Sequence, residues 1–208
     1  MPDSSLPALV ATGLREIPVV APPDAIDRLA DLAELVFLWG KRLNLTGHRS
    51  PEAIVRRLVL DAAALLGVLP SFASVADLGA GAGFPGLPIA ILRPESRVFL
   101  VEARERRHHF QRQVIRELGL TNVGAIRGRF EEVEPTRCDL VVAQAVAAPQ
   151  ALAVEMCRWA TPGATLAVPG GALPRSAGPQ PRLESATTLS YALPLGGPVR
   201  TIWIARAL

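Results

Sequence analysis

A glycine-rich segment carries the clearest chemical pattern in this chain. Residues 75–86 read VADLGAGAGFPG, with an apolar run before them and a helical pattern after them. Open α/β sheets bind ligands at this kind of strand-to-helix turn. Glycine there lets the backbone approach a ligand and adopt positive φ angles that side chains disfavour. The sequence therefore predicts a ligand-binding loop, although a glycine-rich turn that binds nothing is an alternative.

Two glycine spacings overlap in this loop and favour different ligands. Gly81, Gly83 and Gly86 match G-x-G-x-x-G, which holds a dinucleotide pyrophosphate at a helix N-terminus. Gly79, Gly81 and Gly83 match the G-x-G-x-G loop of S-adenosylmethionine-dependent methyltransferases, which has an acidic residue two positions ahead. The glycines alone do not decide between the two cofactors.

Two carboxylates and the end of the chain favour S-adenosylmethionine. Asp77 lies just before the glycines, where its charge suits an ammonium group and would repel a pyrophosphate. Glu102 ends the next expected strand, where it can accept both ribose hydroxyl hydrogens of either cofactor. The chain then closes with a hairpin pattern instead of a second mononucleotide-binding half. We therefore predict S-adenosylmethionine, with a nicotinamide oxidoreductase as the alternative.

The elements that must position these groups alternate from residue 72 onwards. The expected strands are 74–78, 97–101, 122–126, 138–143 and 164–168, and the expected helices are 85–92, 104–118 and 149–159. Alternation with short links predicts an α/β fold with a doubly wound, mostly parallel sheet. Strands 186–193 and 199–205, joined by PLGGP, predict a C-terminal antiparallel hairpin.

Residues 1–71 predict an N-terminal arm and helical appendage, ahead of a cofactor-binding domain at 72–208. The first twenty or so residues read as a loose arm. One helix is expected to begin at Asp24 as N-cap, because apolar residues follow at helical spacing. A second is expected to begin at Ser50, with proline at its first position, and to end at Gly67.

Composition limits the class of protein. The chain has 208 residues, of which 50% are hydrophobic and 20% charged, so a folded core is feasible. No run approaches the ~20 apolar residues of a membrane helix, and the N-terminus does not resemble a secretory signal. We therefore expect a soluble, cytoplasmic monomer with no membrane partner. Cys138 and Cys157 are expected to be reduced, and three histidines without a C-x-x-C pair predict no metal site.

The basic residues permit a polyanionic partner. Lys41 is the only lysine among 22 basic residues, and arginine suits phosphate and carboxylate. The nucleotide composition of the gene is an equally simple explanation of this arginine bias. For any single arginine, the alternative to a phosphate contact is a place on a solvated helix face. Candidate phosphate contacts are Lys41, Arg42, Arg49, Arg56, Arg57, Arg104, Arg106, Arg107, Arg112 and Arg116.

Four motifs together closely resemble those of a known family. They are Trp39 followed by Asn44-Leu45-Thr46, DLGAGAGFPGLPIAILRP at 77–94, FQRQ at 110–113 and GLTNV at 119–123. This combination resembles the GidB/RsmG family, bacterial S-adenosylmethionine-dependent methyltransferases that make 7-methylguanosine in small-subunit ribosomal RNA. The resemblance covers roughly residues 25 to 170. It implies a seven-stranded, Rossmann-like methyltransferase sheet with an N-terminal helical portion.

The resemblance also implies particular cofactor contacts. It places them at Gly79 and Phe84, and at Phe130 and Glu131 in the loop after the third strand. That loop would read the adenine edge, with Glu131 accepting from the adenine amino group. Ordinary core packing is the alternative role of Phe130.

At three positions the chain departs from the family pattern. The family's arginine beside cofactor and target is Gln144 here, its histidine ahead of an Asp-Ser pair is Leu58, and its lysine after the fifth strand is Pro169. Guanine nitrogen 7 has a free lone pair, so methylating it requires placement and no general base. Gln144 near the target is thus compatible with the chemistry, whereas the missing basic groups weaken RNA binding.

The functional hypothesis is methyl transfer from S-adenosylmethionine to a guanine of small-subunit ribosomal RNA. The alternatives are a divergent enzyme with another substrate and a catalytically weakened S-adenosylmethionine-binding protein. The sequence assigns no catalytic residue. The predicted cofactor-binding residues are Asp77, Gly79, Gly81, Phe84, Glu102, Phe130, Glu131 and Gln144.

Overall fold

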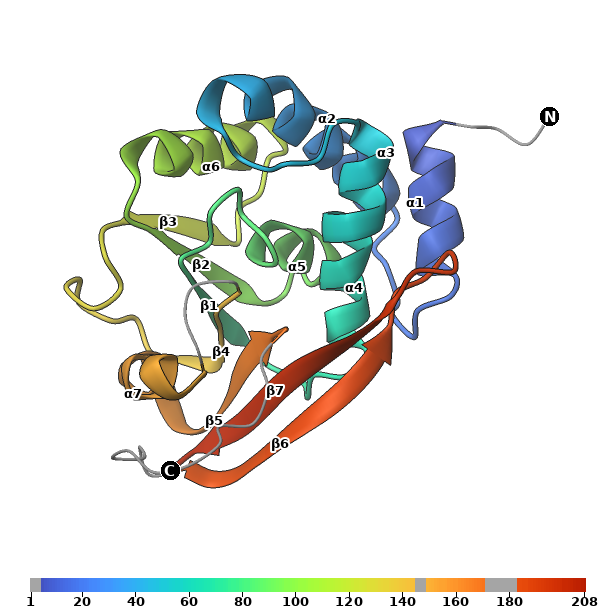
Figure 1. The fold of residues 1–208 in the computed structure, drawn as a ribbon. Helices are drawn as coiled ribbons and strands as arrows, with labels where there is room; N and C mark the ends of the chain where they lie inside the picture. Colours follow the sequence, from blue (N-terminus) through green and yellow to red (C-terminus); the bar gives the residue numbers. More distant parts are fainter. Residues whose placement is uncertain (1–4, 145–148, 171–182) are drawn as a thin grey trace.

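The computed structural model describes residues 5–144, 149–170 and 183–208 (Figure 1). The helices are α1 (Leu6–Leu14), α2 (Ala25–Leu43), α3 (Pro51–Ile54), the π-helical turn η1 (Val55–Val59), α4 (Leu60–Leu66), α5 (Gly86–Leu92), α6 (Glu105–Glu117) and α7 (Pro149–Trp159). The strands are β1 (Ser74–Leu78), β2 (Arg97–Glu102), β3 (Val123–Arg127), β4 (Cys138–Val142), β5 (Ala160–Pro169), β6 (Leu183–Ala192) and β7 (Val199–Ala207).

These strands form one seven-stranded sheet in the order β3-β2-β1-β4-β5-β7-β6. The pairings among β1 to β5 are parallel, whereas β7 inserts antiparallel between β5 and β6. The predicted doubly wound sheet with a C-terminal antiparallel hairpin is therefore confirmed. Strand β4 is central, which agrees with its nearly continuous apolar sequence.

The expectation of a loose N-terminal arm is wrong for residues 6–14, because they form helix α1. The side chain of Ser5 caps this helix by accepting from the Ala8 N–H at 3.4 Å. Val10 and Leu14 are buried in the core. Gly13 has no side chain, so Leu60 packs directly against the helix backbone there. The helix is short, and its stability comes from this tertiary burial, which local sequence patterns underestimate.

The two predicted helix starts in the appendage differ in outcome. Ser50 caps α3 as predicted, since its hydroxyl accepts from the Ala53 N–H at 3.2 Å. Asp24 precedes α2, but its carboxylate makes no capping hydrogen bond and instead pairs with Arg28 at 2.9 Å. The helix expected from Ser50 to Gly67 is interrupted by the π-helical turn η1.

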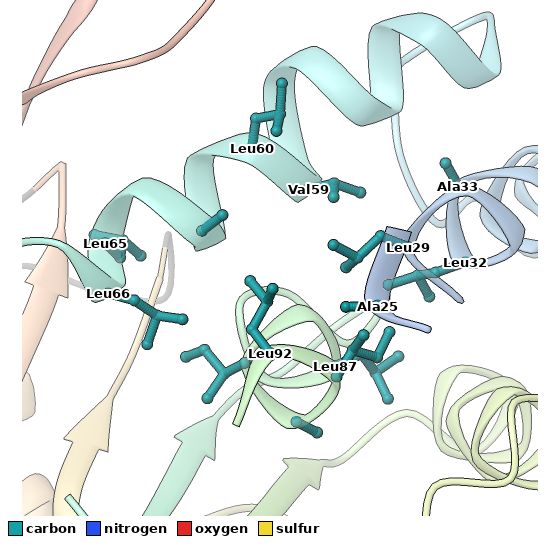
Figure 2. Packing of buried hydrophobic residues seen from close by; sticks show 14 of the residues in the cluster. Ala25, Leu29, Leu32, Ala33, Val59, Leu60, Leu65, Leu66, Leu87 and Leu92 are labelled. Carbon is teal, nitrogen blue, oxygen red and sulfur yellow. The ribbon is translucent and has the colours of Figure 1, made fainter. Parts of the chain in front are cut away.

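The N-terminal helices and the helices of the sheet share one hydrophobic core. Figure 2 shows Leu29 of α2, Val59 of η1 and Leu66 of α4 turned toward the same interior as Leu87 and Leu92 of α5. All of these side chains are buried. The appendage is therefore packed onto α5, the sheet-covering helix that follows the glycine loop.

Candidate functional site

The predicted site residues gather at the carboxyl ends of the central parallel strands. Leu78 at the end of β1 lies opposite Val101 of β2, and Asp77 lies opposite Val142 of β4. The glycine loop, Glu102 and Gln144 each follow one of these strand ends. The sheet therefore brings them to one edge, as its parallel topology requires.

Glu102 holds the glycine loop at this edge. Its side chain is buried, with Oε2 accepting from the Gly81 N–H at 2.9 Å and Oε1 from the Arg104 N–H at 2.8 Å. A carboxylate oxygen can accept two hydrogen bonds, so each oxygen keeps one accepting position. The carboxylate can thus support the loop and also accept from two hydroxyl groups.

The loop itself requires glycine at its first two glycine positions. Gly79 has φ 73° and Gly81 has φ 57°, both in the left-handed region. The Gly79 N–H donates to the Val101 carbonyl at 2.9 Å, which ties the loop to β2. A loop held in this way presents its backbone to the space beyond β1 and β2.

Gln111 is a second support for the loop, and the sequence analysis assigned no role to it. Its Nε2 donates to the Gly81 carbonyl at 2.9 Å, and the residue is completely buried. Within the described part of the chain its Oε1 is buried without a hydrogen-bond partner. Gln111 lies three residues before buried Val114 on α6, so helical spacing could have identified it as inward-facing.

Asp77 lies beneath the loop and is almost completely buried. Its Oδ2 accepts from the Gly86 N–H at 2.9 Å, and a Cβ on Gly86 would stand 2.9 Å from that same oxygen. Burial raises the pKa of Asp77 to about 7; the Gly86 hydrogen bond opposes this shift and the charge of Glu102 adds to it. Oδ1 has no partner among the described residues. The contact of Asp77 with an ammonium group stays a prediction.

A cavity of about 190 Å³ opens between the ends of β1, β2 and β3. Its lining residues are Gly79, Val101, Glu102, Ala103, Gly128, Arg129, Phe130 and Glu131. Four residues that the sequence predicts for a cofactor site therefore come together from the end of β2 and the loops after β1 and β3. The other four lining residues were not predicted as site residues and carry no motif of their own: Val101, Ala103, Gly128 and Arg129.

Phe130 and Glu131 contribute differently to this cavity. The Phe130 ring belongs to the core around Trp159, whose Nε1–H donates to the Phe130 carbonyl at 3.1 Å. Phe130 is therefore a core residue that also lines the cavity. The Glu131 side chain is half-exposed, with one carboxylate oxygen 3.8 Å from the Arg129 Nε. Their contact with adenine stays a prediction.

Phe84 and Gln144 do not line this cavity. Phe84 is half-buried and packs against the core beside the glycine loop. Gln144 is half-buried and is the last described residue after β4. Both residues are close in sequence to residues at the strand ends. Their predicted contacts with the cofactor and the target remain predictions.

A larger cavity, of about 560 Å³, lies between the end of α2 and the loop that follows it. Its lining residues are Phe37, Gly40, Lys41, Asn44, Thr46, Gly47, His48 and Arg49. Arg107 joins this region to the glycine loop. One of its Nη atoms donates to the Asn44 carbonyl at 3.2 Å, and the other lies 3.7 Å from where a Cβ of Gly81 would stand.

The basic residues of α6 are divided among several faces. Glu105 pairs with Arg127 at 2.9 Å and lies 4.0 Å from His109, which neutralises part of the helix surface. Arg106 lines a third cavity, of about 300 Å³, together with Trp39. The candidate phosphate contacts on this helix therefore do not form one continuous basic surface.

The described ranges contain no cluster of His, Cys, Asp and Glu that could hold a metal ion. In the same ranges no helix is both long and apolar enough to span a membrane. Cys138 and Cys157 are free thiols, and burial raises the pKa of Cys138 to about 11.

Comparison with known families identifies the chain. The family described as "GidB: rRNA small subunit methyltransferase G" matches residues 25–173. The chain belongs to the GidB family. The match spans both α2 and the 190 Å³ cavity, so the resemblance predicted from the four motifs is confirmed.

Curated members of the GidB family are moderately similar to the chain. "Ribosomal RNA small subunit methyltransferase G" of Azoarcus sp. (strain BH72) is 36% identical over 137 residues, which cover 65% of this chain and 65% of that protein. The protein of the same name from Nitrosomonas europaea is 38% identical over 138 residues, covering 64% of this chain and 63% of that protein. Both matches span less than two thirds of the relatives' own length.

Solved structures with low sequence identity show the same fold. A SAM-dependent methyltransferase from Aquifex aeolicus superposes with a TM-score of 0.54 at 17% identity, covering 75% of this chain and 93% of that chain. MtNAS in complex with MTA and tNA superposes with a TM-score of 0.56 at 16% identity, covering 85% of this chain and 71% of that chain. These likenesses confirm the α/β methyltransferase-type fold of the GidB chain.

Proposed function

We propose that the chain transfers the methyl group of S-adenosylmethionine to ring nitrogen 7 of a guanine in small-subunit ribosomal RNA. The observation that carries this proposal is the 190 Å³ cavity that unites Gly79, Glu102, Phe130 and Glu131 in a member of the GidB family. Its relatives of 36% and 38% identity are named ribosomal RNA small subunit methyltransferase G. The reaction and its substrates follow from that membership and from the chemistry of the cavity.

The residues at the cavity fit S-adenosylmethionine. Glu102 keeps two accepting positions, which suit the two ribose hydroxyl groups. Gly79 and Gly81 carry no side chain and have positive φ, so the cofactor can approach the loop backbone. Phe130 and Glu131 supply an apolar surface and an acceptor for adenine. Asp77 supports the loop from beneath through Gly86.

The remaining task of the chain is placement. S-adenosylmethionine supplies an electrophilic methyl group, and the lone pair of guanine nitrogen 7 accepts it without prior loss of a proton. The chain must therefore hold the base in line with the methyl group and exclude water, which is catalysis by orientation. A Gln144 amide beyond β4 can donate to the O6 acceptor at the same base edge.

The test is a methylation assay with S-adenosylmethionine labelled in its methyl group and small-subunit ribosomal RNA, either free or in assembled subunits. We expect label in 7-methylguanosine after nuclease digestion and mass spectrometry. Glu102→Ala should weaken S-adenosylmethionine binding at least about tenfold, since it removes hydrogen bonds to a charged group. Glu132→Ala is the matched control, because Glu132 is exposed and does not line the cavity. Label that enters no RNA would contradict the proposal.

A second candidate function is methyl transfer to another substrate. It is favoured by Leu58, Gln144 and Pro169, which carry no positive charge where the family resemblance implies basic groups. A screen of RNA, protein and small-molecule acceptors separates the two candidates. Label restricted to ribosomal RNA excludes this second candidate.

A further inference from the structure

Cofactor binding leaves unexplained a group of positive charges between the N-terminal helices and the C-terminal hairpin. Arg57 lies in η1, Arg200 near the start of β7, and His48 in the loop after α2. His48 has a lowered pKa, mainly because of burial and further because Arg57 and Arg200 lie near it. Segments that are far apart in the sequence therefore place like charges close together, and within the described residues Arg200 alone of the three pairs with a carboxylate.

A buried carboxylate from α4 holds Arg200 in this group. The Oδ1 of Asp61 accepts from the Tyr191 hydroxyl at 2.7 Å, and its Oδ2 lies 3.3 Å from the Arg200 Nε. Asp61 is buried, whereas the Arg200 side chain is 36% exposed. A guanidinium has five N–H donors, and this ion pair engages its Nε edge. The ion pair keeps Arg200 beside Asp61, although its Nε makes no hydrogen bond within the described residues, and the side chain retains some solvent exposure.

The sheet register places Arg200 on the same edge of the sheet as the 190 Å³ cavity. Pro169 of β5 lies opposite Ile202 of β7, and the Gly170 N–H donates to the Thr201 carbonyl at 2.8 Å. Val142 of β4 lies opposite Ala167 of β5. Extending this register by normal strand spacing puts the backbone of Arg200 about 12 Å from that of Gln144.

The same charges continue into the 560 Å³ cavity. His48 lines this cavity together with Lys41 and Arg49, and none of its lining residues is acidic. Lys41, Arg49 and Arg57 are exposed. We call Lys41, His48, Arg49, Arg57 and Arg200 the basic cleft. Its residues come from the end of α2, the loop after it, η1 and the start of β7, and Lys41, His48 and Arg49 line the cavity.

We propose that the basic cleft binds consecutive phosphates of the RNA strand that carries the target guanine, with Asp61 and Tyr191 as positioning residues for Arg200. The identification of the polyanion as RNA rests on the proposed function. The charges are spread over several elements, which suits a phosphodiester chain better than a single phosphate group. Such contacts fix the register of the strand without reading its bases. The cleft thereby supplies positive charge near positions 58, 144 and 169, where this chain has none.

The first experiment measures binding of in-vitro-transcribed small-subunit ribosomal RNA by filter retention between 50 and 200 mM salt, roughly the range over which phosphate contacts dominate. Arg57→Ala should lower affinity about tenfold and reduce the slope of log affinity against log salt by about one. Lys41→Ala and Arg49→Ala should do the same.

Arg206→Ala is the matched control. Arg206 lies on the same strand as Arg200 and also pairs with a carboxylate, at 3.3 Å from Glu184. It stands six residues further along β7, about 20 Å from Arg200. Its removal should change neither the affinity nor the salt slope.

Arg200 needs a variant that does not leave Asp61 buried and unpaired. The double variant Asp61→Asn with Arg200→Gln removes both charges together. It should reduce the slope of log affinity against log salt by about one. S-adenosylmethionine affinity by calorimetry should be unchanged in this variant. Arg200→Lys should restore the slope because it restores the charge, a rescue that a merely structural role would not give.

Methylation measured in parallel separates this inference from the proposed function. If the wild-type chain methylates RNA and all the cleft variants keep their affinity and salt slope, the inference is overturned and the proposed function stands. If the wild-type chain does not methylate RNA but the cleft variants reduce the slope of log affinity against log salt, the proposed function is contradicted. The phosphate-binding role of the basic cleft is then supported.

Discussion

At the level of single residues, two carboxylates at the sheet edge have opposite surroundings. Glu102 is stabilised by two backbone N–H groups, whereas Asp77 receives one and keeps a buried oxygen without a partner in the described structure. Burial and the nearby charge of Glu102 both raise the pKa of Asp77, against its single hydrogen bond, to about 7. Charge on Asp77 is therefore costly, whereas both carboxylate oxygens of Glu102 accept backbone hydrogen bonds.

Asp77 should make stability depend on pH. Its folded pKa of about 7 lies above the ordinary value of 3.8, so its stabilising contribution is complete below about pH 4 and is lost as pH rises through 7. Asp77→Asn keeps an acceptor for the Gly86 N–H and carries no charge. Relative to wild type, it should be more stable at pH 8 than at pH 4 by about 2 to 4 kcal/mol.

Urea unfolding at the two pH values measures this difference. Asp31→Asn on the exposed side of α2 is the control and should show no pH-dependent difference from wild type. An Asp77→Asn variant with the same pH profile as wild type would mean that Asp77 is not the titrating group.

Gln144 should limit the methylation rate through electrostatics. Gln144→Arg places a cation next to the proposed target, and a charge-assisted hydrogen bond there is worth about 1–3 kcal/mol. We expect about a tenfold rise in kcat/KM for ribosomal RNA and no change in S-adenosylmethionine affinity. Ser185→Arg adds the same charge on exposed β6 and serves as the control. Equal gains from both variants would show that net charge, and not position 144, is responsible.

At the level of elements, the hairpin β6–β7 connects the sheet to the N-terminal helices. In Figure 1 it reaches from the sheet to the side of α4 and α1. Tyr191 contacts Asp61 of α4, and the Leu195 N–H at the hairpin turn donates to a carboxylate oxygen of Glu16 at 2.8 Å. The hairpin therefore fixes Arg200 relative to the helical appendage in addition to completing the sheet.

The contact between hairpin and α4 should contribute measurably to stability. Tyr191→Phe removes the donor to buried Asp61 and leaves that carboxylate poorly solvated, so we expect a loss of about 1–3 kcal/mol. Ser190→Ala is the control, because Ser190 is exposed on the same strand. Thermal unfolding of both variants compares them directly, and a Tyr191→Phe protein as stable as Ser190→Ala would exclude this anchoring role.

At the level of the whole molecule, the division at residue 71/72 does not separate two hydrophobic cores. Leu29 of α2 is buried against the same interior as Leu87 of α5 (Figure 2). We therefore propose that 1–71 and 72–208 unfold as one cooperative unit. Leu29→Ala should destabilise the whole chain by about 2–5 kcal/mol through lost burial and a cavity.

Cooperativity is checked by following unfolding of Leu29→Ala with two probes. Tryptophan fluorescence, to which buried Trp159 and Trp203 of the sheet region contribute together with Trp39 of α2, should give the same midpoint as far-UV circular dichroism. Leu38→Ala, at an exposed position of the same helix, is the control. Two separated transitions would show that the appendage and the sheet are independent domains.

The sequence by itself determined the features that depend on local patterns. Alternating apolar runs and helical periods predicted the doubly wound, mostly parallel sheet. The glycine spacing predicted the loop, because the backbone conformation of glycine is a local property. Ser50 and Asp24 show the limit of such patterns. Both residue types favour an N-cap, but the hydrogen bond depends on backbone angles that the residue type does not fix.

The tertiary structure alone decided which distant side chains meet. Asp61 and Tyr191 are 130 residues apart, and no local pattern pairs them with Arg200. Helix α1 likewise forms because Val10 and Leu14 are buried against the core. A local sequence pattern does not show that this tertiary contact is available. The loop chemistry could thus be predicted in advance, whereas the basic cleft beside it depends on how the hairpin closes over α4.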